Sequence, residues 1–212
     1  MIHVLDIILV IGAYLLGSIP TSVWVGRYFY GIDVREHGSG NAGATNTIRV
    51  IGLKAGIPVL IFDVFKGWLA VNLVFLSTYS IPETVSFTNF QLALGTAALI
   101  GHIFPIFAGF RGGKGVATLF GMVLAIDTYP TLICTGIFIL VLILSKYVSL
   151  SSMIAGFSFP IMVIFVFKTT ITSLVIFSLC VAIMLLLTHQ KNLQRLLKGE
   201  ESKATFLMKK KH

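Results

Sequence analysis

The amino-acid sequence predicts an all-α integral membrane protein with seven transmembrane helices, an outside N-terminus, a cytoplasmic C-terminus and a short fourth helix. Composition is the first reason, because 56% of the 212 residues are apolar and 11% are charged, whereas a water-soluble domain has roughly a quarter charged residues. The second reason is the length of several apolar runs, which is close to the length of about 20 residues that a helix needs to cross a hydrocarbon core. These runs are continuous rather than alternating, which favours helices over barrel strands.

The predicted spans cover residues 4–25, 55–76, 90–107, 116–126, 129–144, 148–167 and 171–187. The first run has no basic residue before Arg27, so we expect a retained helix rather than a cleaved signal. The fourth span reaches about 16 Å at helical rise, half the hydrocarbon thickness. It is therefore either a half-helix or a helix that polar flanking turns extend. Pro58, Pro105 and Pro160 lie inside spans, where neighbouring helices can satisfy the freed carbonyls.

Basic residues set the predicted orientation, because connections rich in Lys and Arg face the cytoplasm. One set of alternate connections holds Glu83, Asp127 and a single base, Lys168. The other set holds Arg27, Arg35, Arg49, Lys54, Arg111, Lys114, Lys146 and every base from Lys191 onward. Seven crossings then bring residues 38–49, 110–118 and 189–199 to the cytoplasmic side. If the fourth segment did not cross, the basic C-terminal segment would lie outside, against the rule.

We expect a single membrane-embedded domain, residues 1–212, with a basic tail along the cytoplasmic interface at about 192–212. Leu193, Leu196 and Leu197 share a helical face among bases in this tail, a pattern typical of helices at the lipid surface. The formal net charge of +8 indicates anionic lipid headgroups as partners, because one-sided basic charge is the usual topological signal. No nucleic acid is expected.

The first polar segment, residues 38–49, reads GSGNAGATNTIR. Backbone N–H groups in such loops can converge on an anion, and Gly40 and Gly43 permit a close approach or a positive φ. Flexible connectors between helices have the same composition. The lack of any apolar side chain larger than Ala before Ile48, followed by Arg49, favours the anion site.

The second segment, residues 110–118, reads FRGGKGVAT and places Gly112, Gly113 and Lys114 at the start of a helix. The partial positive charge of a helix N-terminus adds to the ammonium there. The segment lacks the GxxxxGK[ST] spacing and the preceding strand of a nucleotide-binding loop, so no nucleotide is expected. A positive-inside anchor with a tight glycine turn is the alternative.

The third segment, residues 189–199, reads HQKNLQRLLKG and spaces His189, Asn192 and Arg195 at i, i+3 and i+6. The first two share a helical face, with Arg195 turned partly away. A histidine, an amide and a guanidinium together suit a phosphate. A helix end whose bases cap carbonyls and lie among headgroups is the alternative. Three such segments on one face favour a common anion site.

Two ionisable features lie inside the predicted spans. Asp63 and Lys66 stand three residues apart, close enough to neutralise each other, so a structural pairing is expected. His102, in GHIFPIF, is a weaker candidate for substrate contact, because a neutral histidine satisfied by a neighbouring helix is more frequent.

The segments GSGNAGATNTIR, GHIFPIFAGFRGGKGVAT and HQKNLQRLLKGEE closely resemble the motifs of the bacterial acyl-phosphate:glycerol-3-phosphate acyltransferases, the PlsY family. The resemblance runs end to end, with the motifs in order and no departure in their cores. It implies transfer of a fatty acyl group from acyl phosphate to the 1-hydroxyl of glycerol 3-phosphate, giving lysophosphatidic acid and inorganic phosphate, the first acylation of phospholipid synthesis. It also implies the bacterial inner (plasma) membrane, with an active site that faces the cytoplasm.

The resemblance assigns roles to the matching positions. Acyl phosphate would be held by Ser39 and by the backbone amides of Gly40, Asn41 and Gly43. Glycerol 3-phosphate would be held by Arg49, Lys114, His189 and Asn192. The catalytic set would be Ser39, Lys114, His189 and Asn192, with support from Thr45, Asn46, Gly112, Gly113 and Arg195.

Acyl phosphate is a mixed anhydride with a good leaving group, so no metal, cofactor or serine nucleophile is required. Two groups remain candidates for the general base. One is a phosphate oxygen of the donor, with the protein supplying position and charge stabilisation, and the other is His189. The competing function is a small-anion or phosphate-metabolite transporter, whose charges are expected near the midplane of broken, repeated helices. Here the charges lie in cytoplasmic connections.

Overall fold

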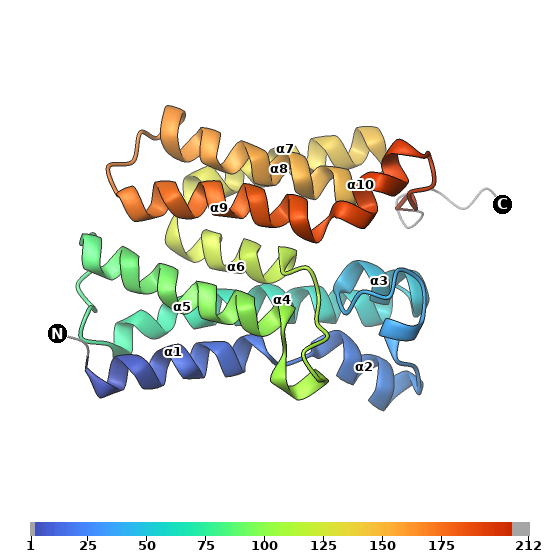
Figure 1. The fold of residues 1–212 in the computed structure, drawn as a ribbon, viewed down its shortest axis with the longest axis horizontal. Helices are drawn as coiled ribbons and strands as arrows, with labels where there is room; N and C mark the ends of the chain where they lie inside the picture. The colour runs from blue at the N-terminus through green and yellow to red at the C-terminus, as the bar shows by residue number, and fades with distance from the viewer. Residues whose placement is uncertain (1–2, 205–212) are drawn as a thin grey trace. The chain divides into compact units, whose positions relative to one another are not determined.

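The computed structural model describes residues 3–204, and every regular element within them is helical (Figure 1). The chain divides into two compact units, Met1–Asp127 and Thr128–His212. The helical architecture agrees with the predicted fold class. The first unit holds the first two polar segments, and the second unit holds the third.

Six α-helices form the described part of the first unit. They are α1 (Val4–Gly17), α2 (Thr21–Tyr30), α3 (Ala44–Val50), α4 (Leu53–Asn72), α5 (Val85–Ile103) and α6 (Val116–Ile126), with 3-10 turns at Val34–Glu36, Leu73–Leu76 and Ile106–Ala108. Within this unit α4 packs against α6, and α1 packs against α5. Ala13, Ala70, Leu94 and Ala98 lie in the buried core between them.

Glycines let the helices of this unit approach one another closely. A Cβ on Gly17 of α1 would overlap the carbonyl oxygen of Ala98 in α5. Likewise, a Cβ on Gly121 of α6 would overlap the carbonyl oxygen of Val64 in α4. In lipid, helices associate through such close packing because little hydrophobic driving force acts between them. The helices that carry the polar loops are therefore tightly packed.

The first predicted span, residues 4–25, is wrong as a single helix. It is broken between α1 and α2, whose axes differ in direction by 42°. Pro20 explains the break, because proline has no N–H and disfavours helical backbone in the preceding residue. The side chain of Lys66 in α4 donates a 3.0 Å hydrogen bond to the carbonyl of Ile19. A polar backbone group exposed by the break is thereby satisfied.

The third predicted span, residues 90–107, lies inside the apolar segment Val85–Ala108 and begins later than the structure shows. The helix α5 begins at Val85, where the hydroxyl of Thr84 accepts the N–H of Phe87 at 3.1 Å and caps the first turn. The α-helix ends at Ile103, so Pro105 lies outside α5, directly before the 3-10 turn Ile106–Ala108, but still inside the apolar segment Val85–Ala108 as predicted. By contrast, Pro58 and Pro160 do lie inside helices. The fourth predicted segment, residues 116–126, matches the bounds of α6.

The described part of the second unit contains α7 (Thr128–Ser145), α8 (Val148–Ile161), α9 (Thr172–Thr188) and α10 (Gln190–Leu197). The helix α8 packs against both α7 and α9. A π-helical segment, Met162–Val166, continues α8 just after Pro160, where the missing proline N–H loosens the regular ladder. The axes of α9 and α10 differ by 60°, and His189 lies at the bend.

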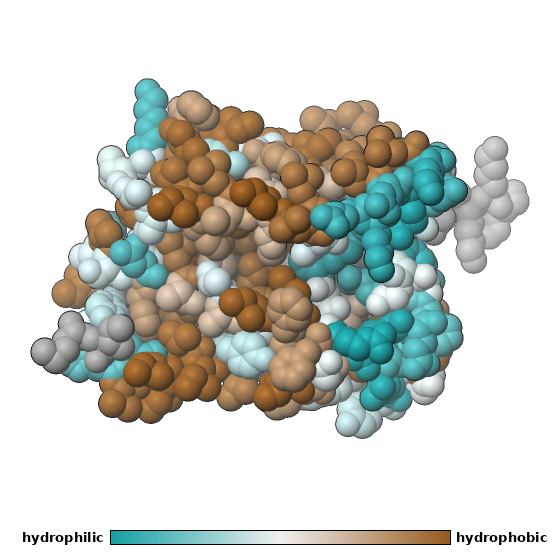
Figure 2. Space-filling view, viewed as in Figure 1, coloured by the Kyte–Doolittle hydropathy of each residue, from teal (hydrophilic) through white to brown (hydrophobic). Residues whose placement is uncertain are grey.

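Within residues 3–204, four helical segments are long and apolar enough to cross a membrane: Leu53–Leu76, Val85–Ala108, Thr128–Ser145 and Val148–Val166. The number rises to six if the bent pairs α1–α2 and α9–α10 each form one span, and α6 is shorter. Large apolar side chains such as Ile61 and Leu140 are exposed, and apolar residues cover much of the visible face in Figure 2. This is the build of a multi-pass membrane protein, whereas the count of seven stays a prediction.

Candidate active site

The first polar segment forms a loop that leads into the short helix α3. Gly38 and Gly40 have positive φ values of 61° and 71°, a backbone region that larger residues rarely adopt. Gly43 instead has an extended φ of −148° and stands at the N-cap of α3. The expected positive φ is therefore present at Gly40, while Gly43 does not need it.

Asn46 organises this loop from within α3. Its side-chain oxygen accepts the N–H of Ser39 at 2.8 Å. Its amide donates to the carbonyls of Val34 at 2.8 Å and His37 at 3.1 Å. Asn46 is 2% exposed, so water does not compete for these bonds, and a buried network of this kind holds one conformation. The loop backbone is thus fixed by a single side chain.

The backbone donors of the first loop fall into two groups. The N–H of Ser39 donates to Asn46, and the N–H of Gly40 donates to the carbonyl of His37 at 3.0 Å. Both are therefore used within the loop. Within residues 3–204, the N–H groups of Asn41 and Gly43 donate no hydrogen bond to the protein. These two N–H groups are among the backbone donors that the loop can offer to an anion.

Two further predicted residues lie on α3. Arg49, in the last turn of α3, has an exposed side chain, and Thr45, near its start, is half-buried. The Nη1 atom of Arg49 lies 3.5 Å from the side-chain oxygen of Asn46, at the limit of a hydrogen bond. Arg49 is thus connected to the residue that organises the loop.

The second polar segment folds back onto the end of α5. The N–H of Gly112 donates to the carbonyl of Ile103 at 3.2 Å, and the N–H of Gly113 donates to the carbonyl of His102 at 3.1 Å. Gly115, with a φ of 80°, stands at the N-cap of α6. Lys114 is half-buried directly before it. Lys114 therefore directly precedes the N-terminal end of a helix, where the dipole adds positive potential.

Arg35 connects the two loops. Its Nη1 atom donates to the carbonyls of Ala108 at 2.8 Å and Arg111 at 3.3 Å, both in the second connection. Its Nη2 atom pairs with a carboxylate oxygen of Asp33 at 2.8 Å. The two loops also approach each other at Gly113, where an added Cβ would lie 2.8 Å from the carbonyl oxygen of Ala42. The structure therefore brings the first and second predicted segments into contact.

Asp33 keeps Arg35 in place. Hydrogen bonds from the Arg35 side chain hold the pKa of Asp33 well below its usual range, and they outweigh burial, which raises this pKa. A further bond from Arg27, at 2.8 Å, lowers the pKa as well. The Asp33 carboxylate is therefore ionised throughout the neutral range. The sequence pattern predicts a place for Arg35 only in membrane orientation; the Asp-x-Arg spacing before a glycine-rich loop is the signal that could have indicated this contact.

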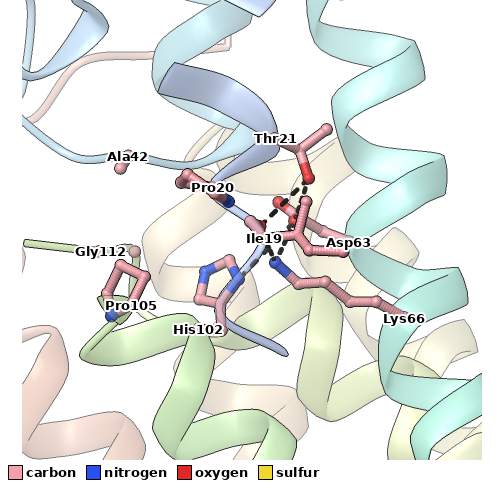
Figure 3. A pocket seen from close by; sticks show the side chains of 10 residues that line it. Ile19, Pro20, Thr21, Ala42, Asp63, Lys66, His102, Pro105 and Gly112 are labelled. Carbon is pink, nitrogen blue, oxygen red and sulfur yellow. Dashed lines mark hydrogen bonds and ion pairs between the residues drawn. The ribbon is translucent and has the colours of Figure 1, made fainter. Parts of the chain in front are cut away.

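A small pocket lies beside both loops, at the break between α1 and α2 (Figure 3). Its lining includes Ala42 and Gly113 from the loops and Asp63, Lys66 and His102 from α4 and α5. The Lys66 ammonium lies 2.7 Å from a carboxylate oxygen of Asp63, which confirms the predicted pairing. His102 is 7% exposed.

The third segment is assembled within the second unit. His189 lies at the bend between α9 and α10 and is 3% exposed. Its Nδ1 atom lies 2.9 Å from the carbonyl oxygen of Leu185. Because a carbonyl only accepts hydrogen bonds, Nδ1 carries the proton in this contact. In the neutral imidazole, Nε2 is then the ring nitrogen that can accept a proton.

Glu201 is a buried carboxylate that the sequence patterns did not predict. It accepts hydrogen bonds from the Asn192 amide at 2.6 Å, the Arg195 guanidinium at 2.7 Å and the Ser149 hydroxyl at 2.9 Å. Burial raises its pKa, but the bonds from Arg195, Asn192 and Ser149 together bring the pKa below its usual value. One sequence signal could have indicated this carboxylate. It is the second glutamate of KGEE, which follows the glycine after α10.

No cation site is evident in the part of the chain that the structure describes. Within residues 3–204, no three His, Cys, Asp or Glu side chains lie together in a way that could hold a metal ion. The two loops of the first unit offer backbone N–H groups together with Arg and Lys side chains. This is the donor set of an anion-binding site.

Comparison with known proteins is consistent with this geometry. The family described as glycerol-3-phosphate acyltransferase matches residues 7–199. A relative of that name from Chlorobium phaeobacteroides (strain BS1) is 39% identical over 94% of this chain and 97% of its own length. Another, from Listeria welshimeri serovar 6b, is 42% identical over 95% of this chain and 98% of its own length.

Two solved structures share the fold along almost the whole chain. Both are of PlsY (YgiH), an integral membrane glycerol 3-phosphate acyltransferase. The glycerol 3-phosphate form matches with a TM-score of 0.81 and 33% identity, and the lysophosphatidic acid form with 0.79 and 34%. In each case the match covers 93% of this chain and 94% of the solved chain. On sequence and fold together, the chain belongs to the glycerol-3-phosphate acyltransferase family.

Proposed function

We propose that this protein transfers a fatty acyl group from acyl phosphate to the 1-hydroxyl of glycerol 3-phosphate, giving lysophosphatidic acid and inorganic phosphate. The observation that carries the proposal is the contact between two glycine-rich loops, which Arg35 joins by hydrogen bonds to Ala108 and Arg111. Family membership supports it, since the relatives are named for this acceptor. The solved PlsY structures are described as glycerol 3-phosphate and lysophosphatidic acid forms, the acceptor and the product.

The two phosphate groups of the reaction have separate proposed binding sets. Ser39 and the N–H groups of Asn41 and Gly43 bind acyl phosphate, and Gly40, whose own N–H is used within the loop, shapes the cradle. Glycerol 3-phosphate is bound by Arg49, Lys114, His189 and Asn192. The supporting residues are Thr45, Asn46, Gly112, Gly113 and Arg195.

The reaction needs a nucleophile, an oxyanion stabiliser and a proton acceptor. The 1-hydroxyl attacks the acyl carbonyl, a new C–O bond forms, and the bond from the carbonyl carbon to the phosphate oxygen breaks. Lys114 and the positive end of α6 lower the energy of the negative charge that develops. The hydroxyl proton passes either to an oxygen of the leaving phosphate or to Nε2 of His189.

The pH dependence of His189→Gln distinguishes the two proton acceptors. If the leaving phosphate takes the proton, the variant keeps the pH profile of the wild type at a reduced rate. Loss of a limb near neutral pH, with unchanged affinity for glycerol 3-phosphate, would contradict substrate assistance and assign the proton to His189. Glutamine is suited to this comparison because its amide hydrogen-bonds but does not titrate.

We propose further that the chain crosses the inner membrane of a bacterium seven times, with the N-terminus outside and the site facing the cytoplasm. The family match runs through both units, which supports one membrane-embedded domain, residues 1–212. Of the expected basic tail, residues 205–212 lie outside the described part of the chain. Single cysteines at Arg111 and Lys168, in a background without Cys134 and Cys180, test the orientation. An impermeant maleimide applied to intact spheroplasts should label position 168 and spare position 111.

A purified-protein assay tests the activity. Protein in detergent, given acyl phosphate and glycerol 3-phosphate, should form lysophosphatidic acid and release one phosphate for each acyl group transferred. Glycerol, which lacks the phosphate, is the matched control acceptor and should react far more slowly. A transporter would instead give no product in detergent and would accumulate labelled glycerol 3-phosphate in proteoliposomes.

A further inference from the structure

We propose that His102 is a positioning residue for acyl transfer, because its ring holds both ends of the second glycine-rich loop and so fixes the place of Lys114. The inference rests on the proposed function, since its effect is read in the binding and acylation of glycerol 3-phosphate. His102 has no assigned part in binding either substrate.

The start of the loop contacts His102 in two ways. The backbone carbonyl of His102 accepts the N–H of Gly113 at 3.1 Å. The imidazole lies against the same glycine, since a Cβ on Gly113 would overlap Nε2 of the ring. Gly113 in turn faces the carbonyl of Ala42 in the first loop, 2.8 Å from the same Cβ position. The ring therefore fills the space beneath the point where the two loops meet.

The end of the loop contacts the other side of the same ring. The Nδ1 atom of His102 lies 3.1 Å from the hydroxyl of Thr118, a residue in the first turn of α6. Thr118 is fully buried, so this bond does not compete with water. Between Gly113 and Thr118 the chain passes through Lys114 and the N-cap Gly115. One side chain thus connects the glycine that precedes Lys114 to the helix that follows it.

Charged groups on neighbouring helices hold the ring in place. Nδ1 of His102 lies 3.7 Å from a carboxylate oxygen of Asp63, and that carboxylate is itself held by Lys66 at 2.7 Å and by the Thr21 hydroxyl at 3.3 Å. Figure 3 shows the imidazole with one edge toward this pair and the other toward Gly112. Because α4 and the start of α2 supply these contacts, the ring orientation is set independently of the loop.

A packing role alone would not require this chemistry. Burying a histidine, a carboxylate and an ammonium within a membrane protein carries a desolvation penalty that an apolar side chain of similar size would avoid. Directed hydrogen bonds, unlike apolar packing, fix the rotation of the imidazole ring. The ring in turn fixes the position of Gly113, which lies against it. Displacement of a substrate-binding group by 1 Å is enough to lower a rate about 100-fold.

The experiment compares His102→Asn and Thr118→Val with the wild type. The amide of asparagine reaches the position of Nδ1 and keeps the bond to Thr118, but it leaves empty the space that the ring edge fills beneath Gly113. Valine at position 118 keeps the shape of threonine and removes the hydroxyl. Both variants should bind glycerol 3-phosphate about 10- to 100-fold more weakly, measured by calorimetry without acyl phosphate. The KM for acyl phosphate should stay within about 2-fold, because the first loop is intact.

Thr78→Val is the matched control for general destabilisation. It removes a 3.0 Å hydrogen bond from Thr78 to the buried carboxylate of Asp6, in the same unit but away from both loops, and it should leave substrate binding unchanged. If His102→Asn keeps the wild-type affinity for glycerol 3-phosphate, the ring serves only to hydrogen-bond Thr118, and the inference is overturned. An equal loss in Thr78→Val, at an equal fall in melting temperature, would also overturn it.

Two further outcomes complete the test. If His102→Asn fails to fold, the affinity of Thr118→Val for glycerol 3-phosphate becomes the test. A wild-type affinity in Thr118→Val then overturns the inference. A wild-type protein that forms no lysophosphatidic acid and binds no glycerol 3-phosphate would refute the proposed function itself. An active wild type with unaltered variants would refute only the role of His102.

Discussion

The side-chain amide of Asn192 donates a 2.6 Å hydrogen bond to Oε1 of Glu201. The two residues lie on either side of the turn that ends α10, where Gly199 adopts a φ of 72°. The other carboxylate oxygen accepts from Arg195 at 2.7 Å. Two residues of the third segment, spaced at i and i+3, are therefore aligned by a shared acceptor. A carboxylate without a substrate role of its own thus orders a proposed substrate-binding surface.

Replacing Glu201 by glutamine should disorganise this surface. The amide keeps the shape of the side chain but cannot accept from all three donors, so at least one donor loses its partner. The free energy of unfolding should fall by about 1–3 kcal/mol, and acyl transfer should fall at least about 10-fold. Glu200→Gln, at the exposed neighbouring position, is the matched control. Equal effects of the two variants on acyl transfer would contradict the role of Glu201.

The Glu201 network should also have a defined pH dependence. Burial raises the Glu201 pKa, but the three hydrogen bonds bring it below its usual value. A carboxylate with a lowered pKa contributes stability above its unfolded pKa of about 4.3 and loses it as pH falls through the folded value. The stability gap between wild type and Glu201→Gln should therefore be constant from about pH 6 to 8 and close below about pH 4. Thermal unfolding in detergent measures it, and a gap that closes near neutral pH would disprove the assignment.

Removing the Lys114 charge should abolish or severely reduce turnover. A phosphate in a site of low dielectric constant loses several kcal/mol of stabilisation when its cation is removed. Lys168→Ala, in an exposed connection between α8 and α9, is the matched control and should keep wild-type turnover. Phosphate release from acyl phosphate in the presence of glycerol 3-phosphate is the measurement. Near-normal turnover in Lys114→Ala would remove Lys114 from the mechanism.

Asn46→Ala should release the first loop. The change leaves the N–H of Ser39 and the carbonyls of Val34 and His37 without their partner. We expect KM for acyl phosphate to rise and the free energy of unfolding to fall by about 1–3 kcal/mol. Asn72→Ala removes a more exposed bond, 2.8 Å to the carbonyl of Trp68, and should change neither quantity appreciably. A wild-type KM in Asn46→Ala would show that the loop holds its shape without this side chain.

Gly17→Ala should separate α1 from α5. The added methyl group would overlap the backbone of Ala98, which cannot move aside as a flexible side chain can. Stability should fall by about 1–3 kcal/mol or more. Gly12→Ala, on the same helix with no atom within 4 Å of the added Cβ, should leave the melting temperature unchanged or raise it. Similar melting temperatures for the two variants would refute the close packing of these helices.

Short-range patterns in the sequence predicted much of the fold. The bounds of α6 agree with the apolar run between Gly115 and Asp127, because both ends are marked by local breakers. The Asp63–Lys66 ion pair was predicted because residues three apart on a helix are neighbours wherever the helix lies. Apolar composition predicts one span over residues 4–25 and does not reveal the break at Pro20, because composition does not register the hydrogen bond that proline removes.

By itself, the sequence determined the helical membrane class, the three polar segments and the residue types that suit phosphate. Each of these depends on composition or on spacing along a few turns of chain. Tertiary structure alone decided which carbonyls Arg35 binds, 73 and 76 positions away, and that Ser149 and Asn192 share the Glu201 carboxylate. Such contacts depend on which helix ends meet after packing. Local propensity does not encode that choice, because the packing energy is gained only when distant segments come together.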